Sequence, residues 1–440
     1  HLVFYKWKNK LNFLFCIFAS PKLTTHYLSL STNHMQINSE IQTLTKVIVH
    51  EPDNGIDHVS PEIAEELLYD DIVFLPRMIE EHYTFTQTLR MLLGDENVCD
   101  IQQLLKDILE DENVRSELLE YIYENEDLSL GKYEMLKQIQ PDYLAATLIS
   151  GVHPVTDGSV IKPLPNLVFT RDIGCVINDY LVVCKANKNA RIRENFLTKF
   201  IVKYHPIFAS FKDKTFDFCI DENLETDSGI SIEGGDIMLI HPRHLLVGES
   251  ERTSLDAIFE LKNYLFEHDV VDFVTIVEIP NERYCMHLDT IFTIIDEETC
   301  VGFAPLMFEK NDKVDIITYS KNNQRAILHP TLKDLIKEIY PNMHFIPCGN
   351  GVSPFAQREQ WTDGCNFVTV KPGVAYCYER NLKTLNAFKE KGFTIISAKR
   401  VLSEEYTLDE LNKTIITIPS AELSRARGGP HCMTFPISRK

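Results

Sequence analysis

The spacing of apolar residues predicts a helical segment in the first part of the chain. Between residues 76 and 150, apolar side chains recur at helical intervals. The clearest stripe consists of Ile101, Leu104, Leu105, Ile108 and Leu109. The positions around this stripe are mostly acidic or polar, which is typical of a helix with one solvated face.

After Gly151 the pattern changes to short strands separated by turns. Four stretches have the order strand, turn, strand: "FTRDIGCVINDYLVVC", "EGGDIMLIHPRHLLVGES", "HLDTIFTIIDEETCVGF" and "GCNFVTVKPGVAYCYERN". Helical stretches follow several of them, such as "RENFLTKFIVKY" and "SLDAIFELKNYLFEH". A strand at 47–49 and another after Cys432 could together form a fifth unit. This internal repeat predicts an α/β protein whose units bury their sheets against one another.

A polar residue opens each of the four hairpins. These residues are Asp172, Asp236, Asp289 and Asn366. In a ring of repeats the hairpin starts would point to one centre, where the polar residues would meet.

Two of these regions carry further candidate groups. His287 and Asp289 stand two positions apart, so in a strand they would share one face. Glu233 and Asp236 flank a glycine pair, where the backbone can approach a ligand closely.

The stretch "SRARGGPHCMTFPI" places Cys432 directly after a turn that can bend at Gly428 and Gly429. Apolar residues then resume, as in a short strand. A cysteine in this position is either an exposed nucleophile or a buried thiol.

One thiol, one imidazole and several carboxylates suit chemistry on a guanidinium group. Carboxylates can hold its N–H groups, a thiolate can attack its carbon, and an imidazole can protonate the departing amine and then activate water. Each residue alone has an ordinary structural explanation, but four repeats that each bury a polar group without purpose would be costly. A thiol protease gives no reason for so many carboxylates, and no spacing specifies a metal site.

The composition narrows the expected partners. The chain has 440 residues, of which 44% are hydrophobic and 25% charged, as in a soluble globular protein. Its formal net charge of −20 argues against nucleic acid or an anionic membrane surface as a partner. The 11 cysteines include no C-x-x-C pair, which favours reduced thiols in a cytoplasmic protein.

The first 34 residues stand apart from this organisation. Lysines precede a short apolar run in "HLVFYKWKNKLNFLFCIFAS", as in a secretory signal peptide. We favour instead an extension outside the fold, non-native or disordered, with Met35 as the natural start.

Six motifs occur in order between residues 165 and 433: "PNLVFTRD", "EGGD", "GESERTS", "MHLDTIFT", "REQWTDG" and "RARGGPHCM". Together with "ELLYDD" at 66–71, they give a sequence that resembles the arginine deiminases, members of the guanidine-modifying (pentein) superfamily. This resemblance implies a five-bladed, pseudosymmetric α/β propeller with an inserted helical bundle. Residues 35–75 and 151–440 would form the propeller, residues 76–150 the helical insertion, and residues 1–34 the extension.

The resemblance also implies catalytic roles. Cys432 is expected to be the nucleophile, and His287 the general acid and base with Glu233 as its partner. Asp172 and Asp289 are expected to clamp the guanidinium group.

Further residues match positions that contact the substrate. Arg191 and Arg252 are expected to bind its α-carboxylate, and Arg427 to be a mobile arginine in the loop before the nucleophile. The remaining residues assigned to substrate binding are Asn166, Phe169 and Asp236.

The implied reaction is the hydrolysis of free L-arginine to L-citrulline and ammonia through a thiouronium-type intermediate, without a metal or an organic cofactor. The expected partner is this small molecule, with no nucleic acid and no membrane, and a homo-oligomer is compatible with the sequence. Two alternatives stay open. One is another guanidine-modifying enzyme, such as an amidinotransferase or a dimethylarginine hydrolase, and the other is a non-catalytic pentein that binds a macromolecule.

Overall fold

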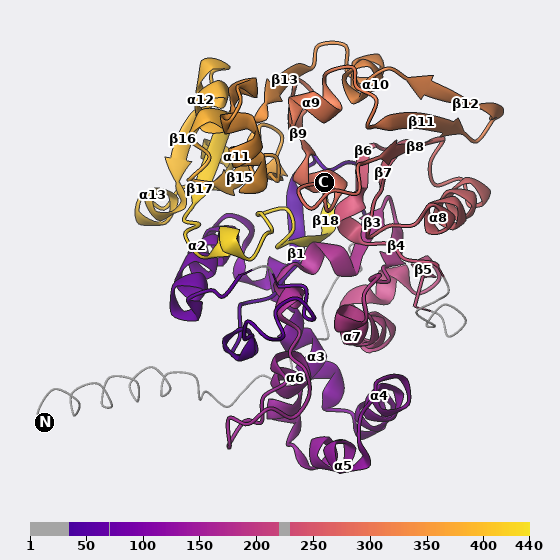
Figure 1. The fold of residues 1–440 in the computed structure, drawn as a ribbon, viewed down its shortest axis with the longest axis vertical. Helices are drawn as coiled ribbons and strands as arrows, with labels where there is room; N and C mark the ends of the chain where they lie inside the picture. Colours follow the sequence, from indigo (N-terminus) through magenta and orange to yellow (C-terminus); the bar gives the residue numbers. More distant parts are fainter. Residues whose placement is uncertain (1–34, 70, 220–228) are drawn as a thin grey trace, which may run out of the picture. The chain divides into compact units, whose positions relative to one another are not determined.

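The structure, a computed structural model, describes residues 35–69, 71–219 and 229–440. The predicted extension, residues 1–34, lies outside the described residues. Within Met35–Lys440 the strands form five sheets, each of which combines parallel and antiparallel pairs (Figure 1). The predicted α/β class is therefore confirmed.

The sheets have the strand orders β18–β1–β2, β3–β4–β5, β12–β11–β8–β7–β6, β13–β10–β9 and β14–β15–β17–β16. The strands are β1 (Leu44–Val49), β2 (Val98–Asp100), β3 (Gly174–Ile177), β4 (Tyr180–Val183), β5 (Thr215–Asp217), β6 (Ile237–His241), β7 (His244–Glu249), β8 (Phe273–Glu278), β9 (Phe292–Asp296), β10 (Thr299–Gly302), β11 (Asp315–Ser320), β12 (Asn323–His329), β13 (His344–Pro347), β14 (Val368–Lys371), β15 (Val374–Tyr378), β16 (Thr394–Ser397), β17 (Thr414–Ile418) and β18 (Phe435–Arg439). The α-helices are α2 (Leu75–Leu93), α3 (Ile101–Leu109), α4 (Glu112–Asn125), α5 (Leu130–Gln138), α6 (Pro141–Ser150), α7 (Ile192–Tyr204), α8 (Leu255–Glu267), α9 (Ala304–Met307), α10 (Leu332–Ile339), α11 (Phe355–Trp361), α12 (Leu382–Glu390) and α13 (Ala398–Ser403).

The four hairpins predicted from the sequence are present as β3–β4, β6–β7, β9–β10 and β14–β15. In each case the second strand of the hairpin also pairs in parallel with a later strand, namely β5, β8, β13 or β17. The chain reaches that later strand through at least one helix, such as α7 or α8. The predicted repeat of hairpin and helix thus recurs with a third, parallel strand in every unit.

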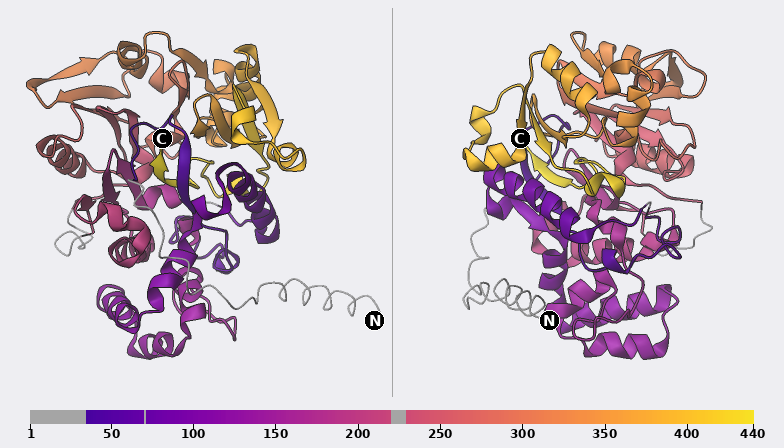
Figure 2. Two further views of the ribbon diagram at one scale, coloured as in Figure 1. Left: turned by 180° about the vertical axis from the view of Figure 1, so that it is seen from behind. Right: turned by 60° about the vertical axis from the view of Figure 1, so that its left-hand side comes forward.

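The two ends of the described chain join in the same way. The last strand, β18, pairs antiparallel with β1, and β1 pairs in parallel with β2 (Figure 2). Helix α2 connects β1 to β2. This arrangement places Cys432 just before a strand that is held by the first strand of the fold.

The polar residues that open three hairpins lie in short 3-10 turns. Asp172 lies in Thr170–Ile173, Asp236 in Gly234–Asp236, and Asp289 in Leu288–Thr290. The expectation that His287 and Asp289 share one face of a strand is therefore wrong. His287 is the extended residue that precedes the turn, and Asp289 lies within the turn, so the two residues do not lie on one pleated strand.

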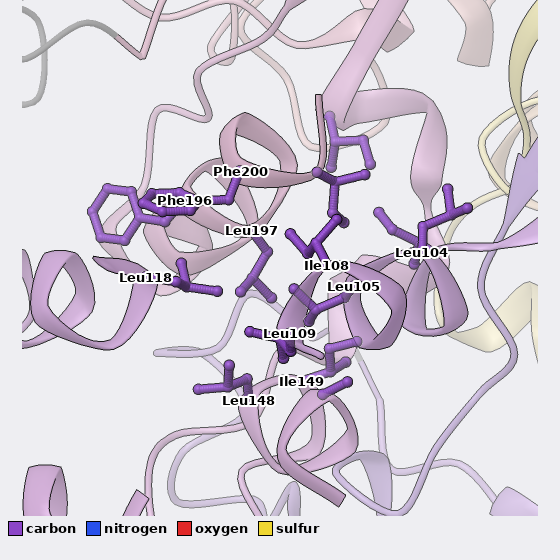
Figure 3. Close-up of a cluster of buried hydrophobic side chains, with 14 of the residues drawn as sticks. Leu104, Leu105, Ile108, Leu109, Leu118, Leu148, Ile149, Phe196, Leu197 and Phe200 are labelled. Carbon is purple, nitrogen blue, oxygen red and sulfur yellow. The ribbon is translucent and has the colours of Figure 1, made fainter. Parts of the chain in front are cut away.

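The predicted helical stretch is helical, but its helices belong to two different cores. The apolar stripe of α3 is buried in a core shared with α4, α6 and α7 (Figure 3). Asp100 begins α3, because its carboxylate accepts hydrogen bonds from the amides of Gln102 and Gln103. Helix α2 instead packs its buried residues, including Phe85 and Leu89, with strands β15 and β17 and helix α13.

No helix in the described ranges is long and apolar enough to cross a membrane.

Candidate active site

A cavity of about 690 Å³ opens where the hairpin starts meet. All of the predicted site residues except Asp236 and Asp289 line it. The turn that carries Asp236 contacts both the turn that carries Asp172 and the turn that carries Asp289. Residues far apart in the chain are thus brought to one place.

Cys432 lies at the base of this cavity and is only 4% exposed. Its Sγ atom accepts a hydrogen bond from Asn366 Nδ2 at 3.1 Å and lies 3.5 Å from Asp289 Oδ2. Asn366 Oδ1 in turn accepts hydrogen bonds from the amides of His431 and Cys432, at 3.0 and 3.1 Å. The amide of Asn366 therefore fixes both the backbone and the sulfur of Cys432.

His287 is held between two carboxylates. Its Nε2 atom is 2.9 Å from Glu233 Oε2, and its Nδ1 atom is 3.8 Å from Asp172 Oδ1. Gly235 lies directly against this ring: a Cβ atom there would stand 2.8 Å from both Cγ and Nδ1 of His287. Gly235 of the "EGGD" motif therefore allows the backbone to lie against His287, whereas the predicted close approach to a ligand stays a prediction.

The charges of the site set its protonation states. Burial opposes the charged imidazolium, but Asp172, Glu233 and Asp236 outweigh it and raise the pKa of His287 to about 10. Burial and the nearby carboxylates of Asp289 and Asp172 raise the pKa of the Cys432 thiol well above its usual range. At neutral pH the site therefore holds a protonated imidazole and a protonated thiol.

Asp289 is fully buried behind Cys432. Its Oδ2 atom is 2.8 Å from His431 Nδ1, and His431 Nε2 is 3.5 Å from Glu40 Oε2. Glu40 also pairs with Arg171 at 2.7 Å. A buried chain of alternating charges thus lies behind Cys432.

Asp236 does not reach the cavity. One of its oxygens accepts a hydrogen bond from the amide of Leu288 at 2.9 Å, and the other from Ser250 Oγ at 2.6 Å. Asp236 therefore ties the turn after His287 to the loop at Ser250, and is placed to position His287 rather than to contact a ligand.

The glycines before Cys432 pack closely and do not have positive φ angles. A Cβ atom on Gly428 would lie 2.2 Å from the ring of Phe169, and one on Gly429 would lie 2.4 Å from Asn366 Oδ1. The residue with positive φ is Arg427, at 62°. The sharp bend expected at the glycine pair thus falls one residue earlier.

The arginines lie along the upper wall of the cavity. The guanidinium carbon of Arg427 lies 3.7 Å from the ring centre of Trp361, and its Nη2 donates to the carbonyl of Arg283 at 3.0 Å. Arg191 is buried and pairs with Asp172, Glu233 and Glu194, whereas Arg252 is half-buried. Asn166 donates from Nδ2 to the carbonyl of Leu67 at 2.7 Å.

Asp172, Glu233 and His287 could also hold a metal ion, since each offers one ligand atom within 4.8 Å of the others. The guanidinium of Arg191 already contacts both carboxylates of this group, at 2.8 and 3.2 Å. These three residues thus form a cation site, and the guanidinium of Arg191 occupies part of it.

Sequence reasoning missed three residues with clear positions in the site: Asn366 as a partner of the sulfur, His431 and Glu194. Asn366 had a signal, because it opens the fourth hairpin. His431 is the neighbour of Cys432 in the motif, but its role depends on Glu40, which is distant in sequence. Glu194 gave no signal within a helical stretch.

Two solved structures share this fold over most of the chain. The N-terminal domain of an arginine dihydrolase from cyanobacteria superposes with a TM-score of 0.51 at 16% identity, covering 90% of this chain and 97% of that one. An amidinotransferase from Microseira wollei superposes with a TM-score of 0.50 at 12% identity, covering 92% and 97%. The described chain therefore shares the fold of these two enzymes.

Comparison with related sequences identifies the family of the chain. The sequence profile of arginine deiminase matches residues 146–439. The arginine deiminase of Limosilactobacillus fermentum is 32% identical over 434 residues, covering 93% of this chain and 99% of the relative. That of Staphylococcus aureus is 32% identical over 433 residues, covering 92% and 98%. The chain belongs to the arginine deiminase family, as its motifs predicted.

Proposed function

We propose that this protein hydrolyses free L-arginine to L-citrulline and ammonia through a covalent intermediate on Cys432. The observation that carries the proposal is a set of buried acceptors around Cys432 and His287. Asp172 Oδ1, Glu233 Oε1 and Asp289 Oδ1 are buried and have no hydrogen-bond partner among the described residues. Asp172 and Glu233 line the cavity, and Asp289 lies just outside its lining, with Oδ2 3.5 Å from Cys432 Sγ. Buried acceptors of this kind are costly, and a planar cation with several N–H donors satisfies them together.

The substrate cation supports the first step. In the free protein the Cys432 thiol keeps its proton, because burial and two carboxylates raise its pKa. A guanidinium beside the sulfur offsets the charge of Asp289 and Asp172 and so favours the thiolate. The thiol proton leaves to solvent as the thiolate forms, because His287 is already protonated and cannot accept it. Asn366 donates a hydrogen bond to the sulfur at 3.1 Å, which also favours the anion.

The reaction then proceeds in two halves. The sulfur attacks the guanidinium carbon and forms a C–S bond, and the protonated His287 gives its proton to the departing nitrogen, so that ammonia leaves as the C–N bond breaks. The neutral imidazole next takes a proton from water, which attacks the same carbon. The C–S bond breaks, releasing citrulline and restoring Cys432. Glu233, 2.9 Å from Nε2, stabilises the charged imidazole at each stage.

The other end of the substrate needs cations. Arg191 and Arg252 line the same cavity as Cys432 and are the residues that we assign to the α-carboxylate. The relatives named arginine deiminase support free arginine as the substrate.

The covalent step can be tested by mass spectrometry of the intact protein. After mixing with L-arginine and quenching in acid, the intact protein should carry an amidine adduct of the substrate, and fragmentation should locate it at Cys432. A protein that forms citrulline with no adduct at Cys432, when samples are quenched at successive times within the first turnover, would contradict the covalent route.

We also propose that the five sheets form the five blades of a pseudosymmetric propeller. The support is that each of the five units has an antiparallel pair whose shared strand pairs in parallel with a later strand. The sequence predicted residues 35–75 and 151–440 for the propeller and residues 76–150 for the insertion. Because β2 (Val98–Asp100) pairs with β1, we propose that the propeller also includes α2 and β2 and that the inserted helices begin with α3. A cytoplasmic location is proposed because all ten described cysteines are free thiols. A homo-oligomer and the lack of nucleic-acid binding stay predictions.

A further inference from the structure

Arg191 contacts two carboxylates to which we have assigned roles. Asp172 is assigned to the guanidinium group of the substrate, and Glu233 is the partner of His287. Its Nη1 atom is 2.8 Å from Asp172 Oδ2 and 3.2 Å from Glu233 Oε2. Its Nε and Nη2 atoms are 2.9 and 2.7 Å from Glu194 Oε2. All four side chains are more than nine-tenths buried. The guanidinium of Arg191 is therefore a built part of the cation site.

The guanidinium of Arg191 is the same chemical group as the guanidinium of the expected ligand, L-arginine. An arginine side chain and free arginine carry the same monosubstituted guanidinium with the same N–H donors. A ligand guanidinium that pairs with both oxygens of Asp172 must therefore displace a like group from Oδ2. Glu194 contacts the opposite edge of Arg191 from Asp172, so it can hold Arg191 by Nε and Nη2 while Nη1 moves away.

We propose that Arg191, anchored on Glu194, occupies the guanidinium site of the free protein as an internal cation and that ligands carrying a carboxylate displace it most readily. This inference rests on the proposed function and adds a second role for Arg191, that of excluding guanidines without a carboxylate.

The selectivity follows from the exchange of ion pairs. L-arginine brings a cation for Asp172 and a carboxylate for the displaced Arg191, so each charge that loses a partner gains one. Agmatine and methylguanidine bring only the cation. Arg191 would then leave Asp172 and Glu233, keep only Glu194 and gain no new anion, and the loss of ion pairs in a buried site is costly.

The test compares Arg191→Gln with Arg252→Gln on two substrates. Both variants lose a carboxylate-binding cation, so kcat/KM for L-arginine should fall in both. Only Arg191→Gln removes the internal cation, so its kcat/KM for agmatine should rise about tenfold or more above that of the wild type. Agmatine activity that falls or stays unchanged in Arg191→Gln, or that rises equally in Arg252→Gln, would overturn the inference.

A binding measurement separates this inference from the proposed function. Methylguanidine at millimolar concentration should raise the melting temperature of Arg191→Gln more than that of the wild type, with no turnover required. If Arg191→Gln is poorly folded, methylguanidine should restore its folding, because the external cation replaces the internal one. Failure of methylguanidine to stabilise Arg191→Gln would contradict the internal-cation role, even with normal citrulline formation by the wild type.

Discussion

Asp172 and Asp289 each keep one buried carboxylate oxygen without a hydrogen-bond partner among the described residues. Replacing either with asparagine keeps the shape but removes the charge that holds a guanidinium. A charge-assisted hydrogen bond in a buried site is worth roughly 2–4 kcal/mol, so we expect kcat/KM for L-arginine to fall about 100-fold or more in each variant. Steady-state citrulline formation measures this. Asp217→Asn, in strand β5 outside the cavity, is the control, and wild-type rates in both clamp variants would show that neither carboxylate holds substrate.

His287 links the charge of the site to the stability of the protein. Despite burial, its neighbouring carboxylates raise its pKa from 6.5 to about 10, so the folded protein binds this proton more tightly than the unfolded chain. The resulting stabilisation is complete below about pH 6.5 and is lost as the pH rises through about 10. The raised pKa of Cys432 acts in the same direction above its ordinary value of 9.0.

The free energy of unfolding should therefore fall between pH 6.5 and 10, and fall less steeply in His287→Gln. Chemical denaturation at several pH values measures it. His82→Gln is the matched control: burial lowers the pKa of His82 to about 3, so its effect lies on the acid side. Equal alkaline slopes for the wild type and His287→Gln would contradict the charge assignment of the site.

The residue types of the site could be predicted from the sequence, but several of their partners could not. Cys432, His287 and Glu233, which line one cavity, could be singled out because their motifs are distinctive and lie beside glycines or hairpin starts. Asp236 belongs to the same kind of motif, yet its oxygens are used by Leu288 and Ser250, which only the folded chain reveals. Residue type alone does not separate a ligand contact from a buried support.

The turns before the hairpins place the catalytic groups. The sequence located these segments but predicted a strand at His287, because a run of three residues is too short for its period to separate an extended chain from a 3-10 turn. The hairpins themselves were predictable, because each is marked by two apolar strands of several residues with turn residues between them. Asn178, with a positive φ, is one such turn residue.

Gly235 tests whether one turn sets the position of His287. In Gly235→Ala the added Cβ would stand 2.8 Å from the imidazole ring and 3.1 Å from Asp172 Oδ1, so the ring must shift. We expect a loss of about 100-fold or more in kcat, since small displacements of a catalytic group have large effects. Gly131→Ala in helix α5 is the control: nothing lies within 4 Å of its Cβ, and it should keep full activity. Unchanged kcat in Gly235→Ala would contradict the tight packing.

The fold unites the two ends of the described chain. A chain that begins at Met35 should fold and retain the full rate, because Met35–Lys440 forms one compact unit. A chain that begins at Thr43 is the matched control. It lacks Glu40, which pairs with Arg171 and His431 beneath the nucleophile, and should lose most of its activity. Circular dichroism and citrulline formation measure both, and an inactive or unfolded Met35 chain would refute the predicted boundary.

The α/β class and the repeat could be read from the sequence because each unit is local. The meeting of the units could only be guessed from the recurring polar residue at each hairpin start. The pairing of β1 with β18 and the ion pairs around Glu40 join residues almost 400 positions apart, and no local pattern encodes them.

The central claim is the hydrolysis of free arginine at Cys432. The most direct measurement is citrulline and ammonia formation from L-arginine by the wild type and by Cys432→Ser, with Cys99→Ser, a cysteine outside the cavity, as control. We predict that the wild type and Cys99→Ser each form citrulline and ammonia in equal amounts and at the same rate. In Cys432→Ser the rate should fall at least about 10³-fold, because a hydroxyl is a far weaker nucleophile than a thiolate. Citrulline formation by Cys432→Ser at near wild-type rate, or none by the wild type, would contradict the account.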